Sequence, residues 1–474
     1  MSLLHPQRLF PADPTTRAIT QSLYDGIKHL PIVSPHGHTD PRWFADNQAF
    51  TDPTSLLIQP DHYVFRMLCS QGIRLEDLGI KTRDGAAIAS DPRRIWQILA
   101  SHWTLFRGTP SRMWLDHVFA EVFGIDEVLS PATANAIYEH IDAQLHTPAF
   151  LPRALLERFN IEVIATTESP IDGMEHHLKL AADPWQINAH GRKRVITAYR
   201  PDPVVDPEFD GFVANLKKFG DITAEDTFSW RGYLQAHRIQ RAHFKQLGAT
   251  STDHGHPSAR TADLADADIE QLFALVSSGK ADAASAELFR AQMLTEMAKM
   301  SIDDGLVMQI HPGSWRNHSK PMLARFGRDK GFDIPRGTEY TAALKPLLDK
   351  LGMDPRLSII LFTLDETSYS RELAPLAGVY PSLKLGPAWW FFDAPEGMRR
   401  FRELTTETAG FANTVGFNDD TRAFLSIPAR HDVARRVDCA YLARLVAEHR
   451  ITEPEAHELA HDLTYRLAKR AYQL

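Results

Sequence analysis

Cysteine is scarce in this chain, whose 474 residues include only Cys69 and Cys439. So few thiols exclude a disulfide framework and also a zinc site built from cysteines. Cysteine-poor chains are typical of a reducing compartment. We therefore expect a cytoplasmic protein whose two cysteines are free.

Long apolar runs are also missing. The longest is LSIILF at 357–362, whereas a membrane-spanning helix needs about 20 apolar residues. The N-terminus, MSLLHPQRLF, lacks the apolar segment of a secretory signal. The net charge of −8 argues against a nucleic-acid partner, although a local basic pocket could still bind a small anion. We expect neither a membrane nor a nucleic acid as a partner.

Short apolar or β-branched runs that end at polar residues recur along the chain. Eight of them lie at 31–38, 161–170, 194–202, 248–255, 305–313, 356–366, 382–387 and 413–420. Segments with helical periodicity separate most of these runs, for example at 286–305, 340–352 and 395–411. Alternating strands and helices predict an α/β fold with a parallel sheet. Eight such units predict a (β/α)8 TIM-like barrel.

One long interval has no strand-like run. Residues 45–152 contain only helical patterns, at 62–73, 92–108, 112–125 and 131–145. They predict a helical insertion domain between strands 1 and 2. The barrel would then comprise residues 1–44, with the first strand, and residues 153–474. At its end, 431–474 predicts two amphipathic helices, the second capped by Thr452.

Two histidines end the first run. Active sites of such barrels lie at the C-terminal ends of the strands. Because residues i and i+2 of a strand point to the same side, His36 and His38 can both face one cation. The alternative is two unrelated histidines. A carboxylate is the expected third ligand of a divalent metal. Asp419 and Asp420 compete for that role at the eighth strand end, and either could instead cap a helix.

Arginines at other strand ends indicate an anionic small molecule. Arg200 ends the third run, Arg316 follows the fifth and Arg422 follows the eighth. Arginine binds a carboxylate or a phosphate through two parallel hydrogen bonds. No glycine-rich phosphate loop is present, so a carboxylate is favoured. The alternative for each arginine is a structural ion pair with Glu168 or Asp365.

Three further groups are candidates for the same site. His311 ends the fifth run and is either a fourth metal ligand or a substrate contact. Trp389 and Trp390 follow the seventh run, and a tryptophan pair either stacks on a sugar or packs in the core. His62 and Tyr63 lie in the helical insertion, where they could equally form a solvated helix start.

Taken together, these motifs resemble those of the uronate isomerase (glucuronate isomerase) family, which is part of the amidohydrolase superfamily. The resemblance runs nearly end to end. It rests on the order and spacing of HGH at 36–38, DHYVFR at 61–66, TT at 166–167, YRPD at 199–202, AHR at 236–238, GATSTDHG at 248–255, MQIHPGSWRN at 308–317, GPAWWFFD at 386–393 and DTRAFLSIPARHD at 420–432. It implies a distorted barrel with the helical insertion after the first strand. It also implies interconversion of D-glucuronate with D-fructuronate and of D-galacturonate with D-tagaturonate in hexuronate catabolism.

The resemblance implies roles for individual residues as well. His36, His38 and Asp420 would hold one divalent metal ion per subunit, usually zinc in this family. Asp420 is preferred to Asp419 because it begins the D-[ST]-R motif of the family. His62 and Tyr63 would reach the site from the insertion and act with Asp420 in catalysis.

Substrate contacts would come from several strand ends. We expect them from Arg200, His311, Arg316, Arg422, Trp389 and Trp390. We also expect a homo-oligomer and no organic cofactor. The reaction would move a proton between C2 and C1 of the open sugar through an enediol, with Asp420 and Tyr63 as the groups that carry it.

A metal-dependent amidohydrolase or lactonase on the same barrel is the alternative function. Such hydrolases commonly carry a bridging lysine or a histidine at the sixth strand end. Here that run ends LFTLDETSYS, without a histidine, so a two-metal hydrolase is disfavoured. A non-catalytic sugar-acid-binding protein is a second alternative, but the many polar strand ends speak against it.

Overall fold

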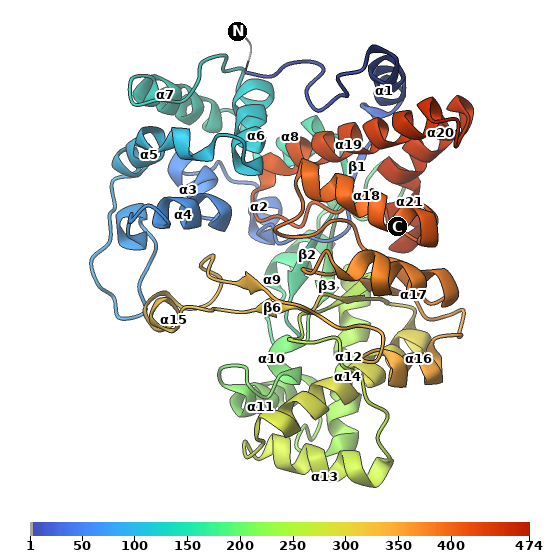
Figure 1. Cartoon of the computed structure of the whole chain (residues 1–474). Helices are drawn as coiled ribbons and strands as arrows, with labels where there is room; N and C mark the ends of the chain where they lie inside the picture. Colours follow the sequence, from blue (N-terminus) through green and yellow to red (C-terminus); the bar gives the residue numbers. More distant parts are fainter. Residues whose placement is uncertain (1–2) are drawn as a thin grey trace.

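The computed structural model describes residues 3–474, and its centre is a parallel sheet of seven strands in the order β1-β2-β3-β4-β5-β8-β9 (Figure 1). The strands are β1 (Ile32–Ser34), β2 (Ile161–Glu168), β3 (Val195–Tyr199), β4 (Ser251–His254), β5 (Val307–Ile310), β8 (Ile359–Leu361) and β9 (Leu383–Leu385). Each coincides with one of the first seven predicted runs. Every pair of neighbours is parallel, as the alternation of strands and helices predicted.

The prediction of an eighth strand at 413–420 is wrong. Within the described residues, 413–420 contributes only an isolated bridge from Thr414 to Leu385. Gly416 and Asp420 have φ angles of 79° and 40°, which interrupt an extended strand. The segment still spans the gap in the sheet, because the His38 amide donates to the Thr421 carbonyl at 3.1 Å. The predicted eight-stranded barrel is therefore a curled seven-stranded sheet with an irregular closing segment.

Helices alone occupy the interval between β1 and β2 within the described residues 35–160. They are α2 (Pro41–Asp46), α3 (Pro53–Leu57), α4 (His62–Cys69), α5 (Pro92–Ser101), α6 (Pro110–His117), α7 (Ala134–Leu145) and α8 (Pro152–Arg158), with shorter turns between them. Three of them begin at Asp-Pro, where the aspartate caps the helix and the proline fills the first helical position. Their buried side chains include Trp96, Trp103 and Phe119, and the cluster reaches Ile32 and Ile161 of the sheet.

The remaining helices precede β1 or follow β2 in the chain, and several of them pack against the strands. They are α1 (Pro14–Ile27), α9 (Glu175–Ala181), α10 (Asp202–Val205), α11 (Phe212–Thr223), α12 (Trp230–Leu247), α13 (Asp266–Ser277), α14 (Ala283–Asp304), α16 (Lys345–Leu351), α17 (Ala374–Val379), α18 (Pro395–Ala409), α19 (Ile427–Ala447), α20 (Glu453–His461) and α21 (Leu467–Ala471). The predicted helix start at Thr452 is confirmed by a capping box with Glu455. Helix α1, near the start of the chain, packs against α19 and α20, near its end (Figure 1).

A segment after β5 was not predicted. Residues 314–336, here called the arm, comprise β6 (Ser314–Trp315), α15 (Lys320–Phe326) and β7 (Ile334–Pro335), which pairs antiparallel to β6. The arm reaches from the sheet to the helices that follow β1 (Figure 1). There the Arg83 amide donates to the Arg325 carbonyl at 2.7 Å, and Arg325 forms an ion pair with Glu76.

The expectation of free cysteines is confirmed. Cys69 and Cys439 are both free. In the part of the chain that the structure describes, no helix has the length and apolar character needed to cross a bilayer.

Candidate active site

A cavity of about 810 Å³ opens at the C-terminal ends of the strands. The eleven site residues predicted from the sequence all line it: His36, His38, His62, Tyr63, Arg200, His311, Arg316, Trp389, Trp390, Asp420 and Arg422. They come from five of the predicted strand ends and from α4. The positions of the predicted strand ends therefore indicated where the cavity lies. The two exceptions are His62 and Tyr63, which belong to helix α4 and not to a strand end.

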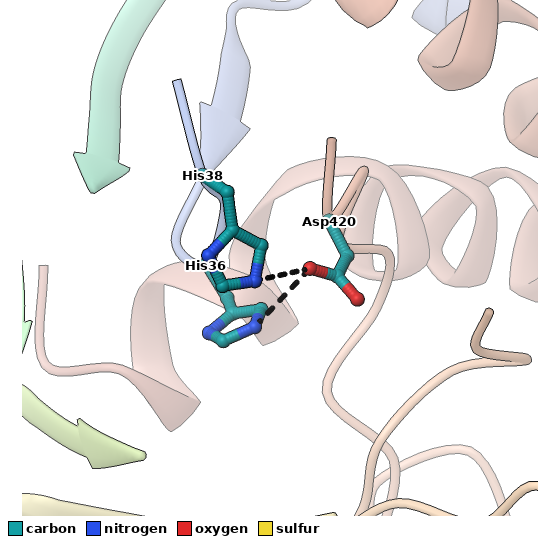
Figure 2. Close-up of side chains that lie close together, drawn as sticks. All are labelled: His36, His38 and Asp420. Carbon is teal, nitrogen blue, oxygen red and sulfur yellow. Dashed lines mark ion pairs between the residues drawn. The ribbon is translucent and has the colours of Figure 1, made fainter. Parts of the chain in front are cut away.

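His36, His38 and Asp420 meet at one wall of the cavity (Figure 2). The Nε2 atoms of His36 and His38 lie 3.3 and 3.2 Å from Asp420 Oδ1. Strand β1 ends at Ser34, so the two imidazoles converge from the loop that follows and not from the strand itself. That loop is fixed by the bond from the His38 amide to Thr421 and by a bond of 2.9 Å from the Thr167 hydroxyl to the Gly37 carbonyl.

The three side chains fit a divalent metal ion. One donor atom of each lies within 4.8 Å of the others, and two imidazoles with one carboxylate form a usual ligand set. The Oδ1 atom of Asp420 is buried and has no hydrogen-bond partner. Burial alone would raise the pKa of Asp420, but His36 and His38 hold it well below its usual range. The carboxylate is therefore ionised, as a metal ligand must be.

Asp420 is further oriented by Trp389. The indole N–H of Trp389 donates to Asp420 Oδ2, which leaves Oδ1 facing the histidines. The adjacent Asp419 points elsewhere, because its Oδ2 lies 3.0 Å from His431 Nε2. Of the two candidate aspartates, only Asp420 faces His36 and His38.

His311 and Arg200 belong to a network of buried charges. His311 Nε2 forms an ion pair with Asp253, which is fully buried. Arg200 donates to Asp202 Oδ2 at 2.9 Å, and its second contact is Asp253 Oδ2 at 3.2 Å. Burial would raise the pKa of Asp253, but His311 and Arg200 hold it well below its usual range. The partners of Arg200 are thus Asp202 and Asp253, and neither is the residue considered from the sequence.

Arg316 and Arg422 lie on the side of the cavity that the arm covers. Arg316 NH1 is 3.4 Å from Asp333 Oδ2 and 4.0 Å from Asp329 Oδ1. Arg422 NH2 is 3.6 Å from Asp329 Oδ2. Both guanidiniums are about one-third exposed. Neither forms the ion pair with Glu168 or Asp365 that the sequence suggested as an alternative.

The contribution of α4 depends on its first turn. Asp61 caps the helix by accepting the Tyr63 amide at 2.9 Å, which turns His62 and Tyr63 toward the cavity. Burial lowers the pKa of His62 to about 3, so the imidazole is neutral, and its Nε2 has no hydrogen-bond partner. The Tyr63 hydroxyl donates to Asp393 Oδ1 at 3.1 Å. Burial beside Asp393 raises the pKa of Tyr63 well above its usual value, so the phenol keeps its proton.

The two tryptophans have different surroundings. Trp389 is almost fully buried and packs against His311, with 5.0 Å between ring centroids. Trp390 is half-buried in the cavity wall, and the Arg316 guanidinium lies 5.6 Å from its ring centroid. Trp390 therefore offers its ring to the cavity, whereas Trp389 supports Asp420.

Four functional neighbours were missed. Asp329 and Asp333 lie on the arm, which left no periodic signal in the sequence. Asp393 and Arg430 both fall inside motifs quoted above, GPAWWFFD and DTRAFLSIPARHD, but received no role. Arg430 donates to Asp393 at 2.7 Å and is buried beneath the site. An unusually polar residue within an apolar motif was the signal that could have found this pair.

A curled parallel sheet with a polar cavity and a His-His-Asp cluster at its strand ends defines an α/β enzyme of the barrel type. A family model described as glucuronate isomerase matches residues 15–472. A uronate isomerase of Mesorhizobium japonicum is 64% identical over 474 residues, which is 100% of both chains.

Two solved structures are similar over their whole length. Glucuronate isomerase from Caulobacter crescentus is 60% identical, with a TM-score of 0.97 over 100% of this chain and 98% of that one. Uronate isomerase from Thermotoga maritima is 26% identical, with a TM-score of 0.90 over 99% of each chain. The chain belongs to the glucuronate isomerase family. The resemblance seen in the motifs is thereby confirmed, and the protein is an isomerase of hexuronate metabolism.

Proposed function

We propose that the protein interconverts D-glucuronate with D-fructuronate and D-galacturonate with D-tagaturonate. One observation carries the proposal: the His-His-Asp cluster and three arginines line the same cavity. A uronate needs both features, because one end of the molecule must be deprotonated at carbon while the other end carries a carboxylate. The family to which the chain belongs supports the same reaction.

The reaction requires proton movements at two carbons and two oxygens. A base removes the proton on C2 of the open aldose, an enediol forms, and a proton is delivered to C1. The proton on O2 is lost and one is gained at O1, so the ketose has the composition of the aldose. We assign to Asp420 the removal of the proton from C2 and its delivery to C1, because its carboxylate is ionised and lies in the cavity wall. Tyr63 keeps its proton and can donate it toward the sugar oxygens.

His62 and Trp390 would bind the sugar without changing charge. The imidazole of His62 is neutral and its Nε2 is unpartnered, so it can accept a hydrogen bond from a hydroxyl. The Trp390 indole N–H is likewise unpartnered and can donate one. We assign the C6 carboxylate to Arg422 because Arg200 is already held between two aspartates.

His36, His38 and Asp420 would hold a divalent metal ion, which we propose to be zinc, at one ion per chain. When bound, such an ion would polarise an oxygen of the substrate and stabilise the charge that develops on it. The residues of the chain that orient this ligand set are Trp389, which donates to Asp420, and Thr167, which fixes Gly37.

Incubation of the purified protein with D-glucuronate and D-galacturonate tests the proposal. We expect a ketose to form from both, and the rate to be measured before and after chelator treatment and again after addition of zinc. D-Glucose and D-galactose, which lack the carboxylate, are the matched controls and should not react. Formation of a new carboxylate from a lactone or an amide, without any ketose from either uronate, would favour the hydrolase instead.

A further inference from the structure

Asp329 lies in the cavity between two arginines that face the proposed substrate. It belongs to the arm, in the loop that joins α15 to β7. Its Oδ2 is 3.6 Å from Arg422 NH2 and its Oδ1 is 4.0 Å from Arg316 NH1. Both distances exceed a hydrogen bond. The carboxylate is thus held by charge alone, and its side chain is half exposed to the cavity.

The other two predicted substrate arginines have carboxylate partners of their own. Arg200 contacts Asp202 and Asp253, and Arg316 contacts Asp333. Arg422 has Asp329 as its sole ion-pair partner within residues 3–474. Burial would raise the pKa of Asp329, but the two neighbouring arginines lower it, so the carboxylate is ionised. Asp329 is therefore the anion that balances Arg422 while no substrate is bound.

Asp329 lies between two glycines in a loop whose backbone is left-handed at all three positions. Gly327 and Gly331 flank it, with φ angles of 83° and 76°, and Asp329 itself has a φ of 59°. A Cβ added at Gly331 would lie 3.2 Å from the His62 carbonyl oxygen, so the loop rests closely on α4 there. Asp333 anchors the far end, where it accepts the Asn317 amide at 2.5 Å. The loop is fixed at its base, and Asp329 is loosely held at its tip.

We propose that Asp329 occupies the carboxylate subsite of the substrate-free protein and is displaced by the carboxylate of the uronate. This inference rests on the proposed function and adds a specificity-determining residue to it. The carboxylate of a uronate at Arg422 would repel Asp329, which no hydrogen bond holds in place, so binding of the acid favours displacement of Asp329. A neutral sugar brings no charge to replace Asp329 at Arg422. The subsite therefore admits acids and remains closed to neutral sugars of the same length.

L-Gulonate is the probe that tests this exchange. It is D-glucuronate with the aldehyde reduced, so it keeps the carboxylate and cannot be isomerised. Asp329→Asn removes the charge, keeps the shape and tolerates a positive φ. We expect it to bind L-gulonate about three- to tenfold more tightly than the wild type by calorimetry, which is the scale of a screened charge contact. The gain should shrink at high salt.

The matched control is Asp349→Asn. Asp349 is an exposed carboxylate 2.8 Å from Lys345, and neither residue lines the cavity, so its loss changes the net charge equally and should leave L-gulonate affinity unchanged. D-Glucitol, the neutral analogue, should bind the wild type more weakly than L-gulonate does. Asp329→Gly is a second variant that also suits the backbone.

Equal or weaker binding of L-gulonate by both Asp329 variants would overturn the inference, because Asp329 would then assist the ligand. So would a gain of the same size in Asp349→Asn, which would indicate a general charge effect. Failure of the proposed function has a separate signature: the wild type would form no ketose from D-glucuronate. The binding assay does not depend on turnover, so the two failures can be distinguished.

Discussion

Asp419 and Asp420 are adjacent in the chain and face opposite directions. Asp420 Oδ1 lies 3.3 and 3.2 Å from the imidazoles of His36 and His38, whereas Asp419 Oδ2 lies 3.0 Å from His431. The φ of 40° at Asp420 turns the backbone between them. Asp420 therefore faces the cavity, and Asp419 joins the closing segment to α19.

Separate substitutions should divide the roles of these two aspartates. Asp420→Asn removes a charged residue of the proposed ligand set, so we expect almost no bound metal and an isomerase rate lowered by about 10²–10⁴-fold. Asp419→Asn should bind metal as the wild type does and lose about 1–3 kcal/mol of stability, because His431 would lose a charged partner in the interior. Metal analysis, ketose formation and urea unfolding measure these effects. The assignment fails if Asp419→Asn loses the metal and Asp420→Asn retains it.

Arg422 and Arg200 should also respond differently to replacement by glutamine. Arg200 lies between Asp202 and Asp253, so Arg200→Gln takes the ion-pair partner from Asp202 and leaves Asp253 with His311 alone, which should destabilise the fold by about 3–5 kcal/mol. Arg422→Gln should unfold like the wild type but raise the KM for D-glucuronate by about 10- to 100-fold, because a charged contact to the substrate is lost. Arg399→Gln, at an exposed arginine outside the cavity, is the control for both measurements. A normal KM in Arg422→Gln would place the substrate carboxylate elsewhere.

The neutral state of His62 predicts how stability depends on pH. Its pKa in the folded protein is about 3, whereas an unfolded histidine has a pKa of about 6.5. The unfolded chain therefore binds more protons here, so His62 lowers stability as the pH falls below about 6.5 and contributes nothing above it. From pH 7 to pH 5 the free energy of unfolding should fall by about 2 kcal/mol less in His62→Phe than in the wild type. Urea unfolding at both pH values measures this difference. If the stability of His62→Phe and that of the wild type changed with pH in the same way, His62 would not be a buried neutral imidazole.

The strands and helices were largely predictable because their signals are local. Seven apolar runs became strands, and the helical patterns at 286–305 and 395–411 became α14 and α18. The run at 413–420 did not, because positive φ angles at Gly416 and Asp420 override its apolar composition. The arm was missed for a different reason. Its strands have two residues each and its helix has seven, which is too short for a periodic pattern.

The site residues at the strand ends were predictable from the sequence. The ion-pair partners of their side chains were not. Strand-end logic brought His36, His38 and Asp420 together from opposite ends of the chain. The partners of the arginines depend on side-chain directions that no local pattern encodes. Glu168, once considered as a partner, instead lies 3.3 Å from His177. Asp365 accepts the Thr338 and Thr367 amides.

Arg430 and Asp393 form a buried pair beneath the cavity. Arg430 NH1 donates to Asp393 Oδ2 at 2.7 Å, and the guanidinium lies 3.6 Å from the ring centroid of Trp114. The other oxygen of Asp393 accepts the Tyr63 hydroxyl. The pair thus joins α19 and the loop after β9 to two helices of the segment that follows β1, and it orients Tyr63 through Asp393.

Breaking this pair should separate stability from catalysis. Arg430→Met leaves Asp393 buried without its charge partner and should cost about 3–5 kcal/mol, whereas the exposed pair Arg399–Glu396 should be worth about 1 kcal/mol or less. Adding Asp393→Leu to Arg430→Met removes the unpaired charge, so urea unfolding should show most of the stability restored. The kcat should stay low in this double variant, because Tyr63 has lost the acceptor that orients its hydroxyl. Recovery of kcat together with stability would mean that the pair supports the fold alone and that Tyr63 needs no such partner.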